Sequence, residues 1–234
     1  MFFTINEFEK AYSRYKHGLC DRVSTCTHSN LVHSKFYSDE VDHIRPVIVL
    51  SNTLYQKMGH ISGRYTFINN AIVGDEYYLY DVNTIKKFNL KITQEYIHEI
   101  SKRGLVDVLD WVKKNGLLIE YDNTAIDIAS TCGHINVLEW WKNSGLPLKY
   151  SEKALDDASY SGRLNVLEWW KNSGLPLKYS EKAINDAYLG GLEYILEWWI
   201  KSRLPLKYSH KKIHKMIKKI EDEYYADCFD LDLS

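Results

Sequence analysis

The chain repeats itself every 29 residues over more than half of its length. Four tryptophans and four glycines keep this interval, at Trp111, Trp140, Trp169 and Trp198 and at Gly104, Gly133, Gly162 and Gly191. One stretch of nineteen residues, NVLEWWKNSGLPLKYSEKA, occupies 136–154 and returns unchanged at 165–183. A fixed period of this length indicates a repeat architecture, in which each unit is stabilised by packing on its neighbours.

The period also sets the domain boundaries. Residues 1–76 lack it and form a non-repeat N-terminal region. The other parts are a degenerate first repeat or N-terminal cap at 77–106, full repeats at 107–135, 136–164 and 165–193, a C-terminal capping repeat at 194–222, and an acidic tail at 223–234. We therefore predict a mostly α fold of about four to five repeats behind a small extension.

Each unit has the pattern of two short helices. In the unit 136–164, Ser151 stands at an N-cap position before an apolar stripe, and the same column holds Thr93, Asp122, Ser180 and Ser209. Gly162 is expected to end the first helix, Asn165 to cap the second, and Gly174 to end it in a left-handed conformation. Pro176 prevents that helix from continuing, so the segment LPLKY is predicted to be an extended connector. Helices this short need stacking to be stable.

Residues 124–145, TAIDIASTCGHINVLEWWKNSG, resemble the core of an ankyrin repeat. Thr124 and Ala125 align with the start of its first helix, Gly133 and His134 with its turn, and Gly145 with the end of its second helix. The pattern is also similar to ankyrin repeat proteins of giant DNA viruses of amoebae. This resemblance implies an ankyrin-like helical solenoid that binds proteins without turnover, inside a cell and in the host cytoplasm if the protein is viral.

Two features depart from the ankyrin pattern. The period is 29 residues rather than the usual 33, and the missing residues fall where ankyrin proteins project a hairpin finger. The proline of the ankyrin TPLH motif is replaced by Ala125, Ala154 and Ala183. We therefore expect shortened or absent fingers and helices that start from their Ser or Asp caps.

The paired tryptophans are predicted to be core residues, because a wall between identical repeats should itself repeat. This set comprises Trp111, Trp140, Trp141, Trp169, Trp170, Trp198 and Trp199. Adjacent residues point about 100° apart on a helix, and a helix between two neighbours can bury both. If Trp140 is buried, its replacement by alanine is expected to lower the free energy of unfolding by about 3–5 kcal/mol.

Positions that vary between copies are the candidates for partner contact. They fall in three columns on or just after the first helix: Asp127, Asp156 and Asn185; Ser130, Ser159 and Tyr188; Thr131, Tyr160 and Leu189. The alternative is neutral drift at exposed positions. The sequence itself identifies no partner and no oligomeric state.

Residues 1–76 are predicted to be a small α+β region. Residues 5–16 have the spacing of an amphipathic helix capped by Asn6, and 44–50, 64–73 and 76–82 favour strands. Four potential zinc ligands occur at Cys20, Cys26, His28 and His33, but their spacing does not match a zinc site, so no metal and no cofactor are expected. No phosphate-binding loop, HExxH or GxSxG motif is present, and we predict no enzyme. A metal or enzymatic module in this region stays open as an alternative.

Charge leaves one further alternative. The net charge of −1 gives no global attraction to nucleic acid, yet the last repeat is rich in lysine between Lys201 and Lys219. This stripe is either a phosphate-binding surface or a solubilising cap, which the acidic residues after it can fold back on and neutralise. Neither a signal peptide nor a membrane-spanning run occurs, which predicts an intracellular protein with no membrane contact.

Overall fold

The structure is a computed structural model of the chain, and it describes residues 2–5, 18–20, 23–27, 43–49, 55–58, 65–68, 71–73, 75–117, 120–209 and 212–220. The chain divides into two compact units. The first comprises Met1–Tyr96 and Asp110–Leu118, and the second comprises Ile97–Leu109 and Ile119–Ser234. The division falls inside two helices rather than at residue 76.

The first unit contains an antiparallel sheet. Its described strands are β1 Phe2–Ile5, β2 Gly18–Cys20, β3 Val23–Thr27, β4 His43–Val49, β5 Tyr55–Met58, β6 Tyr65–Ile68, β7 Ala71–Val73 and β8 Tyr77–Tyr78. The order is β2-β7-β4-β1-β3-β6-β5, and β8 pairs with β4. Phe3 is registered opposite Pro46 of β4 and Cys26 of β3, so β1 lies between these two strands.

The strand predictions are confirmed in part. The strand predicted at 44–50 is β4, whereas the segment 64–73 contains two strands, β6 and β7. The strand predicted at 76–82 is limited to β8, because Asp81 already caps a helix. Ile5 ends β1 instead of starting a helix, and the rest of that predicted helix lies outside the described residues.

Helices dominate the chain from Val82 onward, which confirms the mostly α prediction. They are α2 Val82–Phe88, α3 Gln94–Lys102, α4 Val106–Lys114, α5 Thr124–Cys132, α6 Ile135–Asn143, α7 Lys153–Tyr160, α8 Leu164–Asn172, α9 Lys182–Leu189 and α10 Glu193–Lys201, followed by a terminal helix at 212–220. Every described helix is too short or too polar to cross a membrane.

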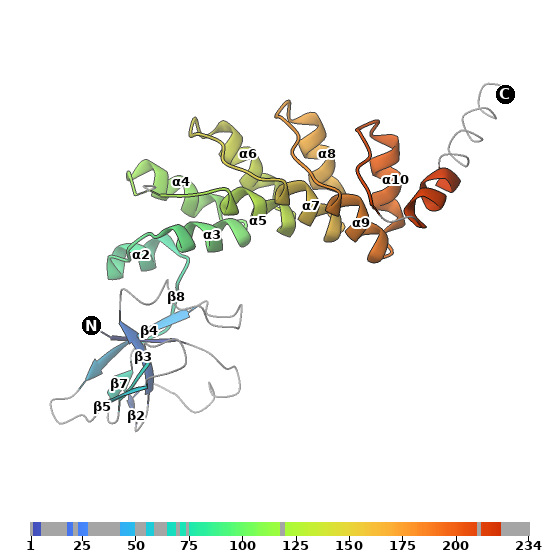
Figure 1. Cartoon of the computed structure of the whole chain (residues 1–234). Coiled ribbons are helices and arrows are strands. Elements are labelled where there is room, and N and C mark those ends of the chain that lie inside the picture. The colour runs from blue at the N-terminus through green and yellow to red at the C-terminus, as the bar shows by residue number, and fades with distance from the viewer. Residues whose placement is uncertain are drawn as a thin grey trace, which may run out of the picture. The chain divides into compact units, whose positions relative to one another are not determined.

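The second unit contains α5 to α10, which are arranged in pairs (Figure 1), while α3 and α4 belong partly to each unit. We call α3, α5, α7, α9 and the terminal helix the first helices, and α4, α6, α8 and α10 the second helices. Neighbouring first helices pack directly on each other, α5 on α7 and α7 on α9, and each also packs on its own second helix. One buried aliphatic column runs through this row, at Ile126, Leu155, Ile184 and Ile213.

The predicted caps act at the first helices. Ser151 Oγ accepts the N–H of Lys153 at 3.2 Å, and Ser180 Oγ accepts that of Lys182 at 3.1 Å. Gly174 adopts the predicted left-handed conformation, with φ of 76°, and Gly162, which follows the first helix, is left-handed as well, with φ of 66°. The prediction for Asn165 is wrong, because α8 begins at Leu164 and no side chain caps it. The turn that ends at Gly162 already sets the direction of the chain there.

Candidate functional site

The second tryptophan of each pair forms the wall between repeats. Trp141, Trp170 and Trp199 are fully buried, as predicted. The ring of Trp170 packs against Tyr150 of the preceding connector, with centroids 4.7 Å apart, and its Nε1–H donates to Ser130 Oγ at 3.1 Å. Trp199 repeats the contact with Ser159 at 3.1 Å. For Trp170 and Trp199, the hydrogen bond that a buried indole requires therefore comes from the first helix of the preceding helix pair. At the equivalent positions one repeat earlier, Trp141 Nε1 and Ser101 Oγ are buried without a hydrogen-bond partner among the described residues.

The first tryptophan of each pair has a different environment. Trp111, Trp140 and Trp169 are only half-buried, so the prediction that they are full core residues is wrong, whereas Trp198 is buried. Residues adjacent in a helix point about 100° apart, and in two of the pairs the first indole reaches the preceding second helix. Trp169 Nε1 donates to Glu139 at 2.5 Å and Trp198 Nε1 to Glu168 at 2.7 Å. These side chains join second helices at a partly exposed polar contact.

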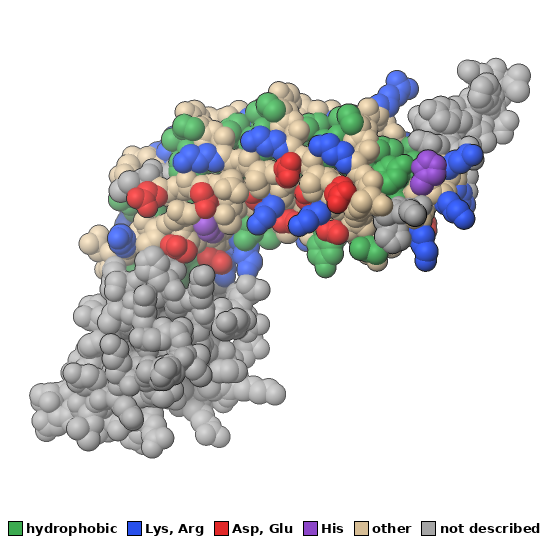
Figure 2. Space-filling view, viewed as in Figure 1, with side chains coloured by type: hydrophobic (Ala, Val, Ile, Leu, Met, Phe, Trp, Pro, Cys, Tyr) green, Lys and Arg blue, Asp and Glu red, His purple; other side chains and the backbone are tan. Residues whose placement is uncertain are grey.

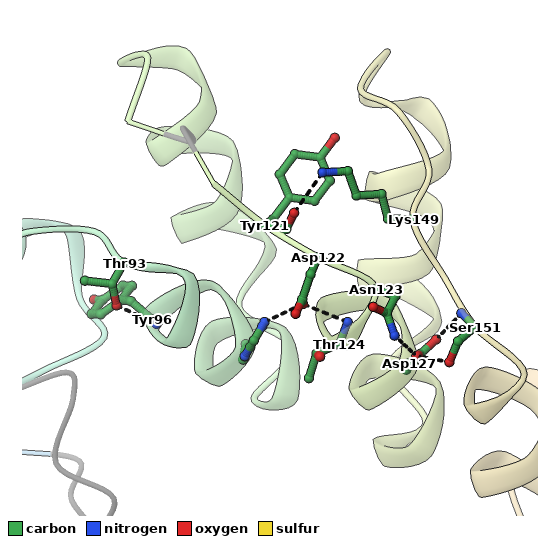
Figure 3. Close-up of polar contacts among 10 residues, drawn as sticks. Thr93, Tyr96, Tyr121, Asp122, Asn123, Thr124, Asp127, Lys149 and Ser151 are labelled. Carbon is green, nitrogen blue, oxygen red and sulfur yellow. Dashed lines mark hydrogen bonds and ion pairs between the residues drawn. The ribbon is translucent and has the colours of Figure 1, made fainter.

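A polar clamp joins consecutive first helices. Asp127 accepts the backbone N–H of Ser151 at 2.9 Å and its hydroxyl at 2.5 Å (Figure 3). Asp156 and Ser180 make the same two bonds, at 2.8 and 2.5 Å. Asn185 and Ser209 are the equivalent pair one repeat later, with a side-chain bond of 3.0 Å.

The first clamp has the opposite polarity. His98 holds the position equivalent to Asp127, and its Nε2 lies 2.8 Å from Asp122, which stands in the cap column. Burial alone would raise the pKa of Asp122, but hydrogen bonds from His98 and from the N–H of Thr124, together with the charge of His98, lower it. All four clamps link residues 24 positions apart; the first has both members replaced, whereas the last replaces only the aspartate.

The clamp and the wall correct four of the nine predicted contact residues. Asp127 and Asp156 are buried because they bind the next repeat, and Ser130 and Ser159 are buried beneath indole rings. Thr131, Asn185 and Tyr188 are half-buried, and the Thr131 hydroxyl donates to the carbonyl of Asp127 in its own helix. Only Tyr160 and Leu189 are exposed. Sequence reasoning missed the clamp, although the constant 24-residue spacing between the Asp or Asn column and the Ser cap column was available as its signal.

The connectors form a second link between repeats. Tyr150 Oη donates to the carbonyl of Pro176 at 2.8 Å, while Lys178 Nζ donates to the carbonyl of Tyr150 at 3.0 Å and lies 4.4 Å from its ring centroid. The same contacts recur at Tyr121 with Pro147 and Lys149, and at Tyr179 with Pro205 and Lys207. Burial raises the pKa of all three tyrosines. The LPLKY segments thus hold adjacent repeats together.

Large hydrophobic side chains reach the surface at one edge of the row. Among the described residues they are Tyr160, Leu164, Leu189 and Tyr194, with exposed fractions of 64%, 38%, 71% and 47%. All four lie where a first helix turns into a second helix, in two neighbouring repeats. Tyr194 Oη donates to the carbonyl of Gly162 at 3.2 Å, which joins the two turns. We call these four residues the apolar edge.

The apolar edge borders a charged stripe on the first helices. Residues three or four apart share one side of a helix, so Lys153, Asp157 and Tyr160 form a line on α7. The equivalent line on α9 is Lys182, Asp186 and Leu189, and on the terminal helix it includes Lys215 and Lys218. We call these eight positions the first-helix face. Burial raises the pKa of Asp157, and Asp156 and Asp127 act in the same direction while Lys153 and Lys182 oppose them.

The two zinc candidates that the structure describes, Cys20 and Cys26, lie far apart. Cys20 lies in β2 and Cys26 in β3, and three strands separate β2 from β3 in the sheet order. Neighbouring strands are about 4.8 Å apart, so these positions are about 19 Å apart across a flat sheet. His28 and His33 lie outside the described residues. The search of the described residues finds no cluster of three metal-binding side chains.

Comparison with known proteins gives no match: no family model matches the chain, and no curated protein or solved structure does.

Proposed function

We propose that this chain is a non-enzymatic protein-interaction scaffold built on ankyrin-type repeats, and that the apolar edge contacts its partner. The observation that carries this proposal is the exposure of Tyr160 and Leu189. They occupy the same column of adjacent repeats, and within the described part of the chain neither side chain has a structural partner of the kind that explains Asp156 or Ser159. Clustered exposed hydrophobic residues mark interaction sites on proteins more often than scattered ones do.

The distribution of identical and varied residues supports the same surface. Residues 136–154 and 165–183 are identical, and their side chains form the wall and the connector links. The intervening residues differ between copies, and those among them that are exposed lie at the turns, as do Leu164 and Tyr194. A partner without the 29-residue period needs different residues at each step, and this edge provides them.

Paired substitutions test the proposal. The double variant Tyr160→Ser/Leu189→Ser removes exposed apolar surface and should leave the unfolding midpoint within the range of ordinary surface changes. Lys142→Ser/Lys171→Ser is the matched control, since both lysines are exposed on second helices and identical between repeats. Because the sequence resembles viral proteins of amoebae, both variants and the unaltered chain are used to capture proteins from amoebal extract.

The proposal expects at least one protein that the unaltered chain and the lysine control retain and the edge variant loses. Equal recovery by all three proteins would contradict the assignment of the apolar edge. Loss of recovery with a lowered unfolding midpoint would instead indicate that Tyr160 and Leu189 stabilise the fold.

Nucleic-acid binding by the last repeat is the second candidate. It is favoured by one observation, namely that residues 198–220 contain seven lysines, one arginine and no Asp or Glu. Lys212, Lys215 and Lys218 are exposed on the terminal helix. Fluorescence anisotropy with a labelled DNA duplex would detect binding that weakens steeply with salt, because lysine–phosphate contacts release counterions. Binding that Lys215→Glu/Lys218→Glu leaves unchanged would remove this candidate.

A further inference from the structure

The first-helix face changes its charge along the row. On α7 and α9 each line pairs one lysine with one aspartate, Lys153 with Asp157 and Lys182 with Asp186, before it ends in an apolar residue. On the terminal helix the aspartate position is Lys215 and the apolar position is Lys218, and both are exposed. Figure 2 shows Lys and Arg side chains gathered at this end of the row. A basic end thus adjoins the apolar edge.

The terminal helix is oriented by its buried side. Ile213 and Ile217 are buried at the positions equivalent to Ile184 and Tyr188, so this helix packs as the last first helix of the row. Lys215 and Lys218 then follow Asp186 and Leu189 in their columns. Helices in contact have axes about 8–10 Å apart, which places α9 about 10 Å and α7 about 20 Å from the terminal helix.

The change along the first-helix face, from apolar residues on α7 and α9 to lysines on the terminal helix, defines the chemistry of a ligand that fits it. It needs negative charge opposite Lys215 and Lys218 and bulky apolar groups opposite Leu189 and Tyr160. The sequence that follows the terminal helix has both properties. Residues 221–234, EDEYYADCFDLDLS, contain six acidic residues, no lysine or arginine, and three aromatic residues.

The length of this segment is sufficient. Fourteen residues follow Ile220, and an extended chain spans about 3.3–3.6 Å per residue, or roughly 46–50 Å in all. That exceeds the distance of about 20 Å from the terminal helix to α7. Because the segment is covalently attached to the row, its binding to the face is intramolecular, and effective concentrations in such cases reach the millimolar range.

We propose that the first-helix face binds the chain's own residues 221–234, with their acidic groups on Lys215 and Lys218 and their aromatic groups on Leu189 and Tyr160. The segment then occupies the surface that the proposed function assigns to a partner, so it competes with that partner. This regulatory role rests on the proposed function, whereas the intramolecular contact does not.

Photocrosslinking in the full-length chain tests the contact. Leu189→p-benzoylphenylalanine places a photoreactive group on the face, and Lys171→p-benzoylphenylalanine places it on α8, a second helix, as a control. After irradiation, monomer is isolated and the crosslinked peptides are mapped by mass spectrometry. The proposal expects crosslinks from position 189 to residues 221–234 and none from position 171.

Two further arms identify the forces. Raising the salt concentration from about 0.05 M to about 0.5 M shortens the electrostatic screening length, and the crosslink yield should fall severalfold. Lys215→Glu/Lys218→Glu should lower the yield similarly at low salt, with an unchanged circular dichroism spectrum showing that the helices remain folded. Equal yields from positions 189 and 171, or a yield insensitive to both changes, would overturn the proposal.

The remaining outcomes separate the alternatives. Crosslinks found only in a species of twice the mass would assign the face to a second copy and overturn the intramolecular contact. Crosslinks from position 189 only to other parts of the chain would overturn it too. Failure to capture any partner protein would count against the proposed function alone, because the intramolecular crosslink does not depend on a partner.

Discussion

The two halves of the repeat differ in what their residues do. In the invariant half, residues 136–154 and 165–183, side chains bind the neighbouring repeat through indoles, tyrosine hydroxyls and lysine ammonium groups. In the variable half, buried residues such as Asp156 still bind the neighbour, whereas exposed ones such as Tyr160 do not. Variation alone therefore does not identify a binding surface. Variation combined with exposure is the criterion on which the apolar edge is proposed as the contact surface.

The largest effect is expected at the wall. Trp170→Ala should lower the free energy of unfolding by about 3–5 kcal/mol, because a fully buried indole is lost and Ser130 loses its donor. Trp169→Ala should cost about 1–2 kcal/mol, since that ring is only half-buried. Urea unfolding followed by circular dichroism measures both. Equal costs for the two would show that the tryptophan columns do not differ as described.

The clamp gives the next largest effect. Asp156→Ala removes both acceptors from Ser180 and should cost about 2 kcal/mol in urea unfolding. Asp156→Asn should cost less than about 1 kcal/mol, because Asn185 serves Ser209 in the same position one repeat later. If the asparagine variant is as unstable as the alanine variant, an amide does not replace the carboxylate in this clamp.

A smaller effect of opposite sign is expected at the end of α10. Arg203 has φ of 59° where the equivalent residues are Gly116, Gly145 and Gly174, and a left-handed conformation costs a residue with a side chain about 1–2 kcal/mol. Arg203→Gly should therefore raise the free energy of unfolding by about 1 kcal/mol. Gly174→Ala should lower the free energy of unfolding by a similar amount. Its cost is limited to the strained backbone conformation, because an added Cβ at this position meets no atom within 4 Å. Thermal unfolding measures both, and a stabilising Gly174→Ala would contradict the argument.

The smallest effect concerns pH at the first clamp. The pKa of Asp122 is lowered in the folded chain, so its carboxylate contributes stability above the unfolded pKa of about 4, and this is lost as pH falls through the folded value. Asp122→Asn should cost less than about 1 kcal/mol at neutral pH, because the carboxylate is 40% exposed, and nothing in strong acid. The measurement is the difference in unfolding midpoint between the unaltered chain and the Asp122→Asn variant, at neutral pH and in strong acid. Asn185→Ala, which alters a clamp without a titrating group, should show no such change.

Periodicity predicted the parts of the fold that depend on repetition. The helical pairs, the cap column and the buried Trp141, Trp170 and Trp199 follow from spacing, because equivalent residues meet equivalent neighbours. Spacing does not say which of two adjacent tryptophans faces the row, so Trp140 and Trp169 were assigned too much burial. Strands of three to five residues such as β2 and β3 leave too few positions for an alternating pattern, and they were not predicted.

The candidate site was only partly predictable for a related reason. Polar residues that vary, such as Asp127 and Ser130, resemble surface residues in a single sequence. Their burial follows from bonds to Ser151 and Trp170, which are 24 and 40 residues away. Tyr160 and Leu189 were found because they vary and lie at the ends of first helices. Leu164 and Tyr194 were missed, because they lie in the first turn of a second helix and the predicted contact columns were confined to the first helix and the residues just after it.

The short reach of the bonds between repeats has a consequence for synthesis of the chain. Side-chain hydrogen bonds of the clamp and wall join residues 24 and 40 positions apart, so each junction can close as soon as the next repeat has been made. Translation at about 5–20 residues per second delivers one 29-residue unit in roughly 1.5–6 s, far longer than a helix needs to form. The row can therefore assemble during translation, one repeat at a time, with only the newest unit leaving its wall tryptophan uncovered.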